Sequence, residues 1–236
     1  MLVKICGITS ETDAMVALGL GANALGFIFA PSPRQVSVRA VQQIVDRLPR
    51  GEAMTVGVFR DELPHKVVEV VNTLGLRAAQ LHGHESAEQT AWVAERVPFT
   101  IRALPAGHPG IARAVSHGAS AVLVDSDSPG SGRVFDWRLA EGVVDPGRLI
   151  VSGGLHAGNV ADAVAHLRPF GVDVCSGVEA EPGRKDPQKV RAFVVAARQA
   201  ALAAGLDDDT ARTDDGTDDD TDDDTDSRPF DWQEQA

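Results

Sequence analysis

The sequence has almost no cysteine. Cys6 and Cys175 are the two cysteines among 236 residues, which are too few for a disulfide framework and lack the paired spacing of a zinc site. The acidic residues and histidines also form no cluster with metal-ligand spacing. We therefore expect two free thiols and no bound metal.

The sequence also lacks a long hydrophobic run. No apolar stretch approaches the roughly 20 residues that a helix needs to cross a bilayer. The N-terminal run Leu2–Ile5 is typical of a short strand and not of a secretory signal peptide. We expect a cytoplasmic protein that does not bind membranes.

An excess of positive charge is missing as well. The net charge is -12, and residues 207–236 account for it with 14 acidic and two basic side chains, while residues 1–206 carry 20 of each. The neutral body has no basic stripe to neutralise nucleic-acid phosphates, and the acidic tail would repel them. The charge distribution therefore disfavours nucleic-acid binding.

The C-terminal segment 207–236 differs in composition from the rest. It repeats Asp and Thr with almost nothing apolar to bury, which predicts a disordered acidic tail after a body of residues 1–206. Its Phe230-Asp231-Trp232 copies Phe135-Asp136-Trp137, and coincidence explains this most simply. Two alternatives stay open. In the first alternative, the terminal aromatics dock on the body or on a partner. In the second, the tail is an adaptation to high salt, but the balanced charge of the body argues against this second alternative.

The body alternates short apolar runs rich in strand-forming residues with amphipathic stretches of about 10 to 15 residues, a pattern typical of repeated β-α units and a parallel sheet. Length alone leaves one domain or two open. The expected strands are Leu2–Cys6, Ala24–Phe29, Met54–Phe59, Ala78–Leu81, Phe99–Ala103, Ala121–Asp125, Leu149–Ser152 and Val172–Cys175.

Helical periodicity separates these strands and follows the last one. Two helices carry start signals, since Ser37 precedes one and Asp186 precedes another that begins with Pro187. The expected helices are Glu11–Leu20, Val38–Leu48, Pro64–Leu74, Ser86–Arg96, Gly110–Ser116, Trp137–Gly142, Gly158–Leu167 and Pro187–Ala204.

Eight β-α units in a body of this length fit a compact (β/α)8 TIM barrel near the lower size limit of that fold. The prediction is therefore an α/β protein, one barrel with a disordered acidic C-terminal tail. A doubly wound sheet of fewer strands is the alternative. In a barrel, the residues that carry chemistry lie at the C-terminal ends of the strands and in the loops that follow.

Those strand ends carry a series of motifs, namely KICGIT, ALGFIF followed by SPR, VGVF, QLHG, VLVD, SGGL, and VDVCSGVE followed by PGRKD. In order and spacing, from Val3 to about Asp186, they resemble the phosphoribosylanthranilate isomerase family. SGGL alone occurs in many phosphate-binding barrels, whereas KICGIT together with the aspartate of the sixth strand is specific. The resemblance implies an isomerase of tryptophan biosynthesis that works on a small phosphosugar by an Amadori rearrangement, without a cofactor.

The resemblance assigns the base to Cys6 and the acid to Asp125. Each ends a predicted strand, so each would lie at the barrel mouth, where a thiolate can remove the C2′ proton and a carboxyl can protonate the ring oxygen. Without the motifs, Cys6 would be interpreted as a small buried hydrophobe. Without the motifs, Asp125 would be interpreted as a loop carboxylate or a cap. Asp127 has the same side chain, but it falls in the loop that follows the strand.

Three further residues match substrate-binding positions of the family. Arg34 follows Pro31-Ser32-Pro33, and its guanidinium is implied to bind the anthranilate carboxylate with two prongs; otherwise it is one of many surface cations. Asp173 is implied to fix substrate hydroxyls or to orient a loop, and a structural role in the barrel core is equally open. His82 would border the sugar or the aromatic ring, without direct catalysis.

The loops after the seventh and eighth strands are expected to bind the substrate phosphate through backbone amides. The residues are Gly153, Gly154, Ser176 and Gly177, and glycine lets an amide approach an anion without a Cβ in the way. A plain tight turn is the competing interpretation of the glycines. Cys175 stands where the family more often has serine, so a weaker thiol replaces a hydroxyl donor.

Two rival functions remain to be compared. The histidine-pathway aminosugar isomerase performs the same type of rearrangement with paired aspartates, but here the first strand ends in Cys6 and one phosphate-binding half is apparent. A non-catalytic barrel that recruits a partner through its tail is a rival of another class, and the joint presence of Cys6, Arg34 and Asp125 argues against it. The family includes monomers and homodimers, and we expect a monomer.

Overall fold

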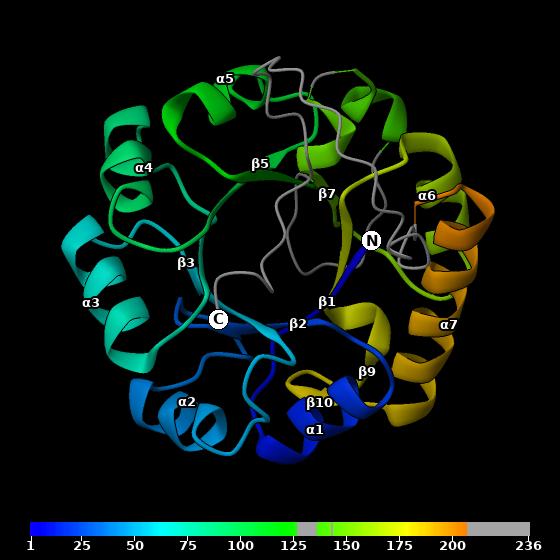
Figure 1. Cartoon of the computed structure of the whole chain (residues 1–236), viewed down its shortest axis with the longest axis horizontal. Coiled ribbons are helices and arrows are strands. Elements are labelled where there is room, and N and C mark those ends of the chain that lie inside the picture. Colours follow the sequence, from blue (N-terminus) through cyan, green and yellow to red (C-terminus); the bar gives the residue numbers. More distant parts are fainter. Residues whose placement is uncertain (127–135, 143, 207–236) are drawn as a thin grey trace, which may run out of the picture.

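The chain folds into a closed barrel of eight parallel strands. The computed structural model describes residues 1–126, 136–142 and 144–206. The strands follow one another around the barrel from β1 to β8, and β8 pairs with β1. Figure 1 looks into the barrel and shows the helices as a ring around the strands. The predicted (β/α)8 barrel is confirmed, and the doubly wound alternative is wrong because the sheet closes on itself.

Four strands have the predicted bounds, and the other four differ by one or two residues at one end or at both. The barrel strands are β1 Leu2–Cys6, β2 Ala24–Ile28, β3 Met54–Phe59, β4 Ala78–Leu81, β5 Thr100–Pro105, β6 Ala121–Asp125, β7 Leu149–Val151 and β8 Gly171–Val174.

The helices lie on the outside of the barrel. The α-helices are α1 Glu11–Gly19, α2 Val38–Val45, α3 Pro64–Leu74, α4 Ala87–Ala94, α5 Ile111–Ala114, α6 Val160–Leu167 and α7 Pro187–Ala203. Short 3₁₀ turns are η1 Val115–His117, η2 Trp137–Ala140, η3 Pro146–Arg148 and η4 Ser176–Val178. No helix in the described part of the chain is long and apolar enough to cross a membrane.

The sixth predicted helix is wrong. The stretch Trp137–Gly142 contains only the 3₁₀ turn η2, because the backbone of Glu141 is extended and Gly142 adopts a positive φ of 64°. The helical conformation therefore ends after the four residues of η2. The fifth helix is also interrupted, since α5 passes into η1.

Local capping confirms both predicted helix starts. The Ser37 side chain accepts a hydrogen bond from the backbone amide of Ala40. Asp186 Oδ1 accepts from the amides of Gln188 and Lys189, and Pro187 occupies the first position of α7. These contacts satisfy amides that a helix start otherwise leaves unpaired.

One element was not predicted, a short antiparallel hairpin after β8. It consists of β9 Glu179–Glu181 and β10 Arg184–Lys185, and Gly183 makes the turn with a φ of 84°. The hairpin lies beside α1 in Figure 1, at the point where the chain passes from β8 to α7. It therefore contributes side chains to the loops at one end of the barrel.

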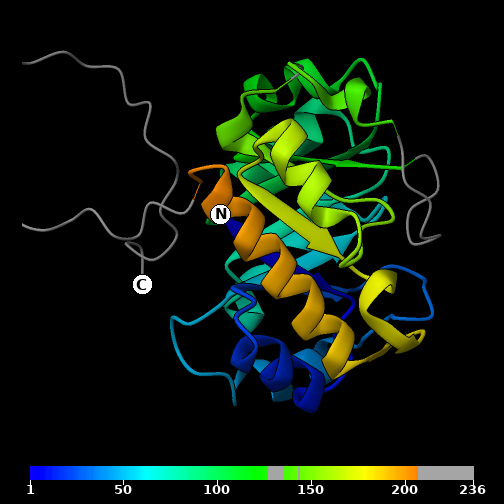
Figure 2. The same ribbon diagram turned by 90° about the vertical axis from the view of Figure 1, so that its right-hand side faces the viewer.

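Two hydrophobic layers build the body. Along β1, Leu2 belongs to the cluster inside the barrel, while Val3 and Ile5 belong to the layer between strands and helices. Because side chains alternate along a strand, Lys4 and Cys6 point into the barrel with Leu2. The long helix α7 covers one side of the barrel (Figure 2), and Arg198 on it donates to the Met1 carbonyl oxygen at 2.7 Å.

Helix α7 offers a test of this layering. Phe193 is fully buried in the outer layer, whereas Val195, two residues later, is exposed. We expect Phe193→Ala to lower the free energy of unfolding by about 3–5 kcal/mol, and Val195→Ala to change it by less than about 0.5 kcal/mol. Urea denaturation followed by circular dichroism measures both values, and equal losses in the two variants would contradict the assigned packing.

Candidate active site

The predicted catalytic residues meet at the C-terminal end of the barrel. Cys6 ends β1 and Asp125 ends β6, and the strands are parallel. Asp173 lies one residue before the end of β8. All three side chains are buried. The barrel thus holds a thiol and two carboxylates at one end of its interior.

A buried ion pair crosses the seam where the barrel closes. Lys4 on β1 and Asp173 on β8 are register partners, and Lys4 Nζ lies 2.8 Å from Asp173 Oδ1. Burial alone would lower the pKa of Lys4, but Asp173 raises it above its ordinary value, so the ammonium stays charged. The structural role left open for Asp173 is therefore visible here. Sequence reasoning missed Lys4, although its spacing of two residues from Cys6 places both on one face.

Cys6 lies directly above this ion pair. The neighbouring Cys175 thiol lowers the pKa of Cys6 to about 6 in spite of burial, and the nearby Lys4 ammonium acts in the same direction. Gly26 on β2 provides the space, because a Cβ there would lie 2.7 Å from Cys6 Sγ and 3.1 Å from Lys4 Nζ. Both thiols are free. The site therefore holds Cys6 in a form suited to remove a proton.

Asp125 is held by its neighbours along the chain and across the barrel. Its Oδ1 accepts a hydrogen bond from the backbone amide of Ser126 at 2.7 Å, and its Oδ2 lies 3.4 Å from His82 Nε2. Gly153 packs against it, because a Cβ there would lie 2.6 Å from the Ser126 nitrogen and 2.9 Å from Asp125 Oδ1. The carboxyl is thus fixed through one oxygen and faces a histidine with the other. Asp127 lies outside the described residues.

His82 contacts the predicted acid, which its position at a strand end alone did not indicate. Gln80 Nε2 lies 3.1 Å from His82 Nδ1. In the tautomer in which Nδ1 accepts from Gln80, the ring carries its proton on Nε2, toward Asp125. The arrangement orients the ring, and it adds Gln80 to the residues that support the site.

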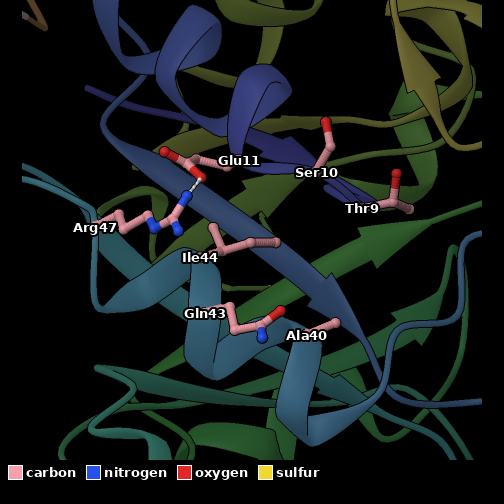
Figure 3. Close-up of a pocket in the computed structure, with 7 residues that line it drawn as sticks. All are labelled: Thr9, Ser10, Glu11, Ala40, Gln43, Ile44 and Arg47. Carbon is pink, nitrogen blue, oxygen red and sulfur yellow. Dashed lines mark hydrogen bonds and ion pairs between the residues drawn. The ribbon is translucent and has the colours of Figure 1, made fainter.

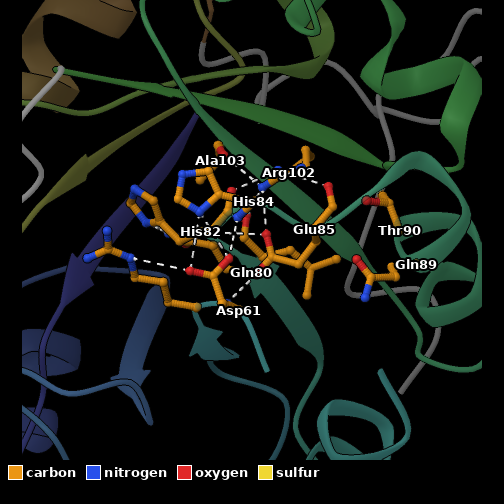
Figure 4. A network of polar contacts seen from close by, with 12 residues as sticks. Asp61, Gln80, His82, His84, Glu85, Gln89, Thr90, Arg102 and Ala103 are labelled. Atoms are coloured by element: carbon orange, nitrogen blue, oxygen red, sulfur yellow. Dashed lines mark hydrogen bonds and ion pairs between the residues drawn. The ribbon is translucent and has the colours of Figure 1, made fainter. Parts of the chain in front are cut away.

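A polar network beneath His82 holds the loop after β4 (Figure 4). Arg102 Nη1 lies 2.9 Å from Glu85 Oε2, and the same guanidinium donates to the carbonyl oxygens of Leu81 and Gly83. Glu85 in turn accepts from the amides of Gly83 and Asp61. Burial lowers the pKa of Arg102, and Glu85 opposes that shift. The loop that carries His82 is therefore held by a buried ion pair that sequence reasoning did not identify.

Arg34 forms a two-pronged bond within the protein. Its Nε donates to Glu179 Oε1 at 2.8 Å and its Nη2 donates to Glu179 Oε2 at 2.7 Å. Glu179 also accepts from Lys185 Nζ at 3.0 Å. Burial alone would raise the pKa of Glu179, but Arg34 and Lys185 lower it, so the carboxylate is charged. One edge of the Arg34 guanidinium is therefore committed to Glu179, and the edge formed by Nη1 and Nη2 points elsewhere.

The hairpin that carries Glu179 and Lys185 is tied to the first loop of the barrel. Thr9 Oγ1 donates to the Gly183 carbonyl oxygen at 2.5 Å. The backbone amide of Lys185 donates to Asp13 Oδ2 on α1 at 3.1 Å. The loops after β1, β2 and β8 therefore form one connected structure around Cys6 and Arg34.

The structure brings the predicted phosphate-binding residues together. Gly153 and Gly154, after β7, have positive φ values of 79° and 68°, while Ser176 and Gly177 form the start of η4. The two loops touch, since a Cβ on Gly177 would overlap the carbonyl oxygen of Leu155. Backbone amides in such loops are suited to anions. The positive φ values also fit the tight turn that was left open.

A separate pocket of about 270 Å³ lies on the outer surface of the barrel, between α1 and α2 (Figure 3). It contains none of the predicted site residues, and the ion pair between Glu11 and Arg47 closes one side. We therefore do not assign the active site to it. The lining residues of this outer pocket are Thr9, Ser10, Glu11, Ala40, Gln43, Ile44 and Arg47.

Among residues 1–126, 136–142 and 144–206, no group of three or more His, Cys, Asp or Glu side chains could hold a metal ion.

Comparisons with known proteins agree with this arrangement. The family model described as N-(5'phosphoribosyl)anthranilate (PRA) isomerase matches residues 3–196. The N-(5'-phosphoribosyl)anthranilate isomerase of Desulforudis audaxviator is 45% identical over 206 residues, which cover 84% of this chain and 98% of that protein.

Solved structures show the same relationship. The phosphoribosyl anthranilate isomerase of Thermus thermophilus matches with a TM-score of 0.77 and 39% identity, covering 86% of this chain and 100% of that one. A phosphoribosyl anthranilate isomerase in complex with reduced 1-(O-carboxyphenylamino)-1-deoxyribulose 5-phosphate matches with a TM-score of 0.74 and 37% identity, covering 84% and 100%. The chain therefore belongs to the N-(5'-phosphoribosyl)anthranilate isomerase family.

Proposed function

We propose that this protein catalyses the Amadori rearrangement of N-(5-phosphoribosyl)anthranilate to 1-(2-carboxyphenylamino)-1-deoxyribulose 5-phosphate in tryptophan biosynthesis, with Cys6 as general base and Asp125 as general acid. Substrate and product are isomers, so the reaction consists of proton transfers and requires no external oxidant or reductant. The observation that carries the proposal is the buried Cys6 sulfur, which lies beside the Lys4 ammonium at the mouth of a barrel of this family.

Ring opening is the first step. Asp125 donates its proton to the furanose ring oxygen, the bond from C1′ to that oxygen breaks, and a Schiff base to the anthranilate nitrogen forms. Asp125 Oδ1 is fixed by the Ser126 amide, which leaves Oδ2 to carry the proton. Once the proton has left, His82 Nε2 at 3.4 Å faces the newly charged oxygen. This supports a role for His82 in holding the carboxylate, with no proton transfer of its own.

Proton removal from C2′ is the second step. The positively charged Schiff base makes this carbon acidic, and the Cys6 thiolate takes its proton to give an enolamine. Tautomerisation of the enolamine then returns a proton to C1′ and leaves a ketone at C2′. The pKa of Cys6 is about 6, so its thiolate form dominates at neutral pH and the base requires no prior activation.

The two ends of the substrate are proposed to bind on separate sets of loops. The phosphate takes hydrogen bonds from backbone amides around Gly153, Gly154, Ser176 and Gly177, at the contact between the loops after β7 and β8. The anthranilate carboxylate accepts two hydrogen bonds from the Nη1 and Nη2 edge of Arg34. Support comes from Glu179, which fixes the guanidinium by its other edge.

Asp173 is proposed to contact sugar hydroxyls through Oδ2, which accepts a hydrogen bond from Ser152 Oγ at 3.3 Å, while Oδ1 pairs with Lys4. Residues 1–206 are proposed as the catalytic domain, and the predicted disorder of residues 207–236 lies outside the described residues. A monomeric state and a cytoplasmic location stay predictions.

Turnover tests the function directly. We expect the wild type to consume freshly made phosphoribosylanthranilate, followed by loss of its fluorescence, with no metal or cofactor added. Cys6→Ser and Asp125→Asn should each lose on the order of 100-fold or more in kcat, because each removes one proton-transfer group. Circular dichroism checks that both variants are folded. A folded wild type without activity would refute the proposed reaction.

The carboxylate contact has a test of its own. Arg34→Lys keeps the charge but loses the planar fork, so we expect KM for phosphoribosylanthranilate to rise by about tenfold or more. Arg47→Lys is the matched control, because Arg47 is exposed and lies in the outer pocket. Steady-state kinetics of both variants supply the comparison. An unchanged KM in Arg34→Lys would remove Arg34 from the proposed binding site.

The division into domains predicts that the acidic tail is not needed for the reaction. A chain truncated after Leu206 keeps every residue of the proposed site, so we expect its kcat and KM to stay within about twofold of the full-length values. The same kinetic assay measures them, and mass and solubility are compared in parallel. A large loss of activity on truncation would favour docking of the terminal aromatics on the body.

A further inference from the structure

Two thiols lie side by side at the seam where the barrel closes. Lys4 pairs with Asp173 and Ile5 with Val174 in the parallel register of β1 and β8. The next residues are Cys6, which ends β1, and Cys175, which directly follows β8. Neighbouring strands lie about 4.8 Å apart, so these two residues face each other across the seam.

Both sulfurs point toward the same crowded region. A Cβ on Gly26 would meet Cys6 Sγ at 2.7 Å, and a Cβ on Gly7 would meet Cys175 Sγ at 2.9 Å. Gly7 directly follows Cys6, so the two glycines leave room for one sulfur each. The strand register places Cys6 and Cys175 side by side at the barrel mouth.

We propose that Cys175 is a positioning residue for the reaction, because its Sγ–H donates a hydrogen bond to Cys6 Sγ and thereby holds Cys6 as the thiolate that removes the C2′ proton. The inference rests on the proposed function, in which Cys6 is the base. Cysteine and serine side chains each carry one hydrogen on the terminal atom, so either residue can donate at this position.

The charged groups around the pair explain why a neutral donor matters. Lys4 lies beside Cys6 on the same strand, but Asp173 on β8 neutralises it. Lys185 on β10 lies 3.9 Å from Cys175 Sγ. Arg34, in the loop after β2, lies near Cys175, since a Cβ on Gly7 would meet both Arg34 Cδ at 2.8 Å and Cys175 Sγ at 2.9 Å.

Lys185 and Arg34 both pair with Glu179. The three cations near the thiols therefore face two carboxylates, Asp173 and Glu179, which reduces their effect on the sulfurs. A hydrogen bond from Cys175 stabilises the Cys6 thiolate without adding charge.

Each sulfur has an ammonium nearby, since Lys4 Nζ lies next to Cys6 and Lys185 Nζ lies 3.9 Å from Cys175 Sγ. The pKa of Cys6 is lowered and the pKa of Cys175 is raised, which favours negative charge on Cys6. Cys175 is therefore the neutral partner at neutral pH and Cys6 the ionised one.

The pH dependence of activity is the first test. In the wild type, kcat/KM should fall as the pH drops through about 6, because protonation of Cys6 removes the base. In Cys175→Ala the pKa of Cys6 should rise, so this limb should move up by about one to two pH units, the typical value of a hydrogen bond to an ionised group. Above the new limb the activity should recover, whereas a merely structural defect would lower it equally at every pH.

Cys175→Ser is the conservative control. Its hydroxyl keeps a donor facing Cys6, so the limb should stay within about half a pH unit of the wild type. A limb in Cys175→Ser that moves as far as in Cys175→Ala would overturn the proposal, because loss of the donor would then not be the cause. Circular dichroism of both variants confirms that each is folded before the profiles are compared.

Alkylation provides a readout that does not depend on isomerase activity. Iodoacetamide reacts with thiolates, and peptide mass spectrometry assigns the modified cysteine. In the wild type Cys6 should react faster than Cys175 at pH 7, and in Cys175→Ala the pH profile of Cys6 alkylation should shift upward with the kinetic limb. An unshifted profile, or faster alkylation of Cys175 than of Cys6, would overturn the role of Cys175. Full activity of Cys6→Ser would instead overturn the proposed function on which it rests.

Discussion

The pairing of β1 with β8 is the contact on which the rest of the site depends. It closes the barrel and places Lys4 against Asp173, so that a fully buried ammonium meets a carboxylate 2.8 Å away. The same register, two residues further on, sets Cys6 opposite Cys175. A slip by one residue would turn these side chains to the outer face, where they would meet the helices. Closure of the fold and placement of the proposed base are therefore one event, and the ion pair helps to fix the strand register.

Buried ion pairs recur around the mouth, and their value lies in geometry more than in stability. The desolvation of two charges commonly offsets their attraction, so such pairs are weak sources of net folding energy. Glu179 holds Arg34 by one edge, and Glu85 with Arg102 holds the loop that carries His82. Each pair fixes a side chain or loop that must be in place before a substrate arrives, which reduces the reorganisation needed on binding.

The sequence predicted those features that depend on local pattern. Strand-length apolar runs and helical periodicity were sufficient for the eight-stranded barrel, and the ordered motifs indicated the family and the candidate residues. The prediction of a helix at Trp137–Gly142 was wrong because Gly142 adopts a left-handed backbone conformation. The link between Arg34 and Glu179 was missed because 145 residues separate them. The same holds for the pairing of Lys4 with Asp173, since partners across a closed sheet are chosen by register and leave no local signal.

A crystal structure of the protein with a stable reduced analogue of the ketose product tests the central claim most directly. The account predicts the phosphate on the amides of Gly154 and Gly177, the anthranilate carboxylate on the outer edge of Arg34, and C2′ next to Cys6 Sγ with Asp125 on the opposite side of the ligand. Binding of the analogue away from this mouth, or with C2′ out of reach of Cys6, would contradict the proposed arrangement of acid and base.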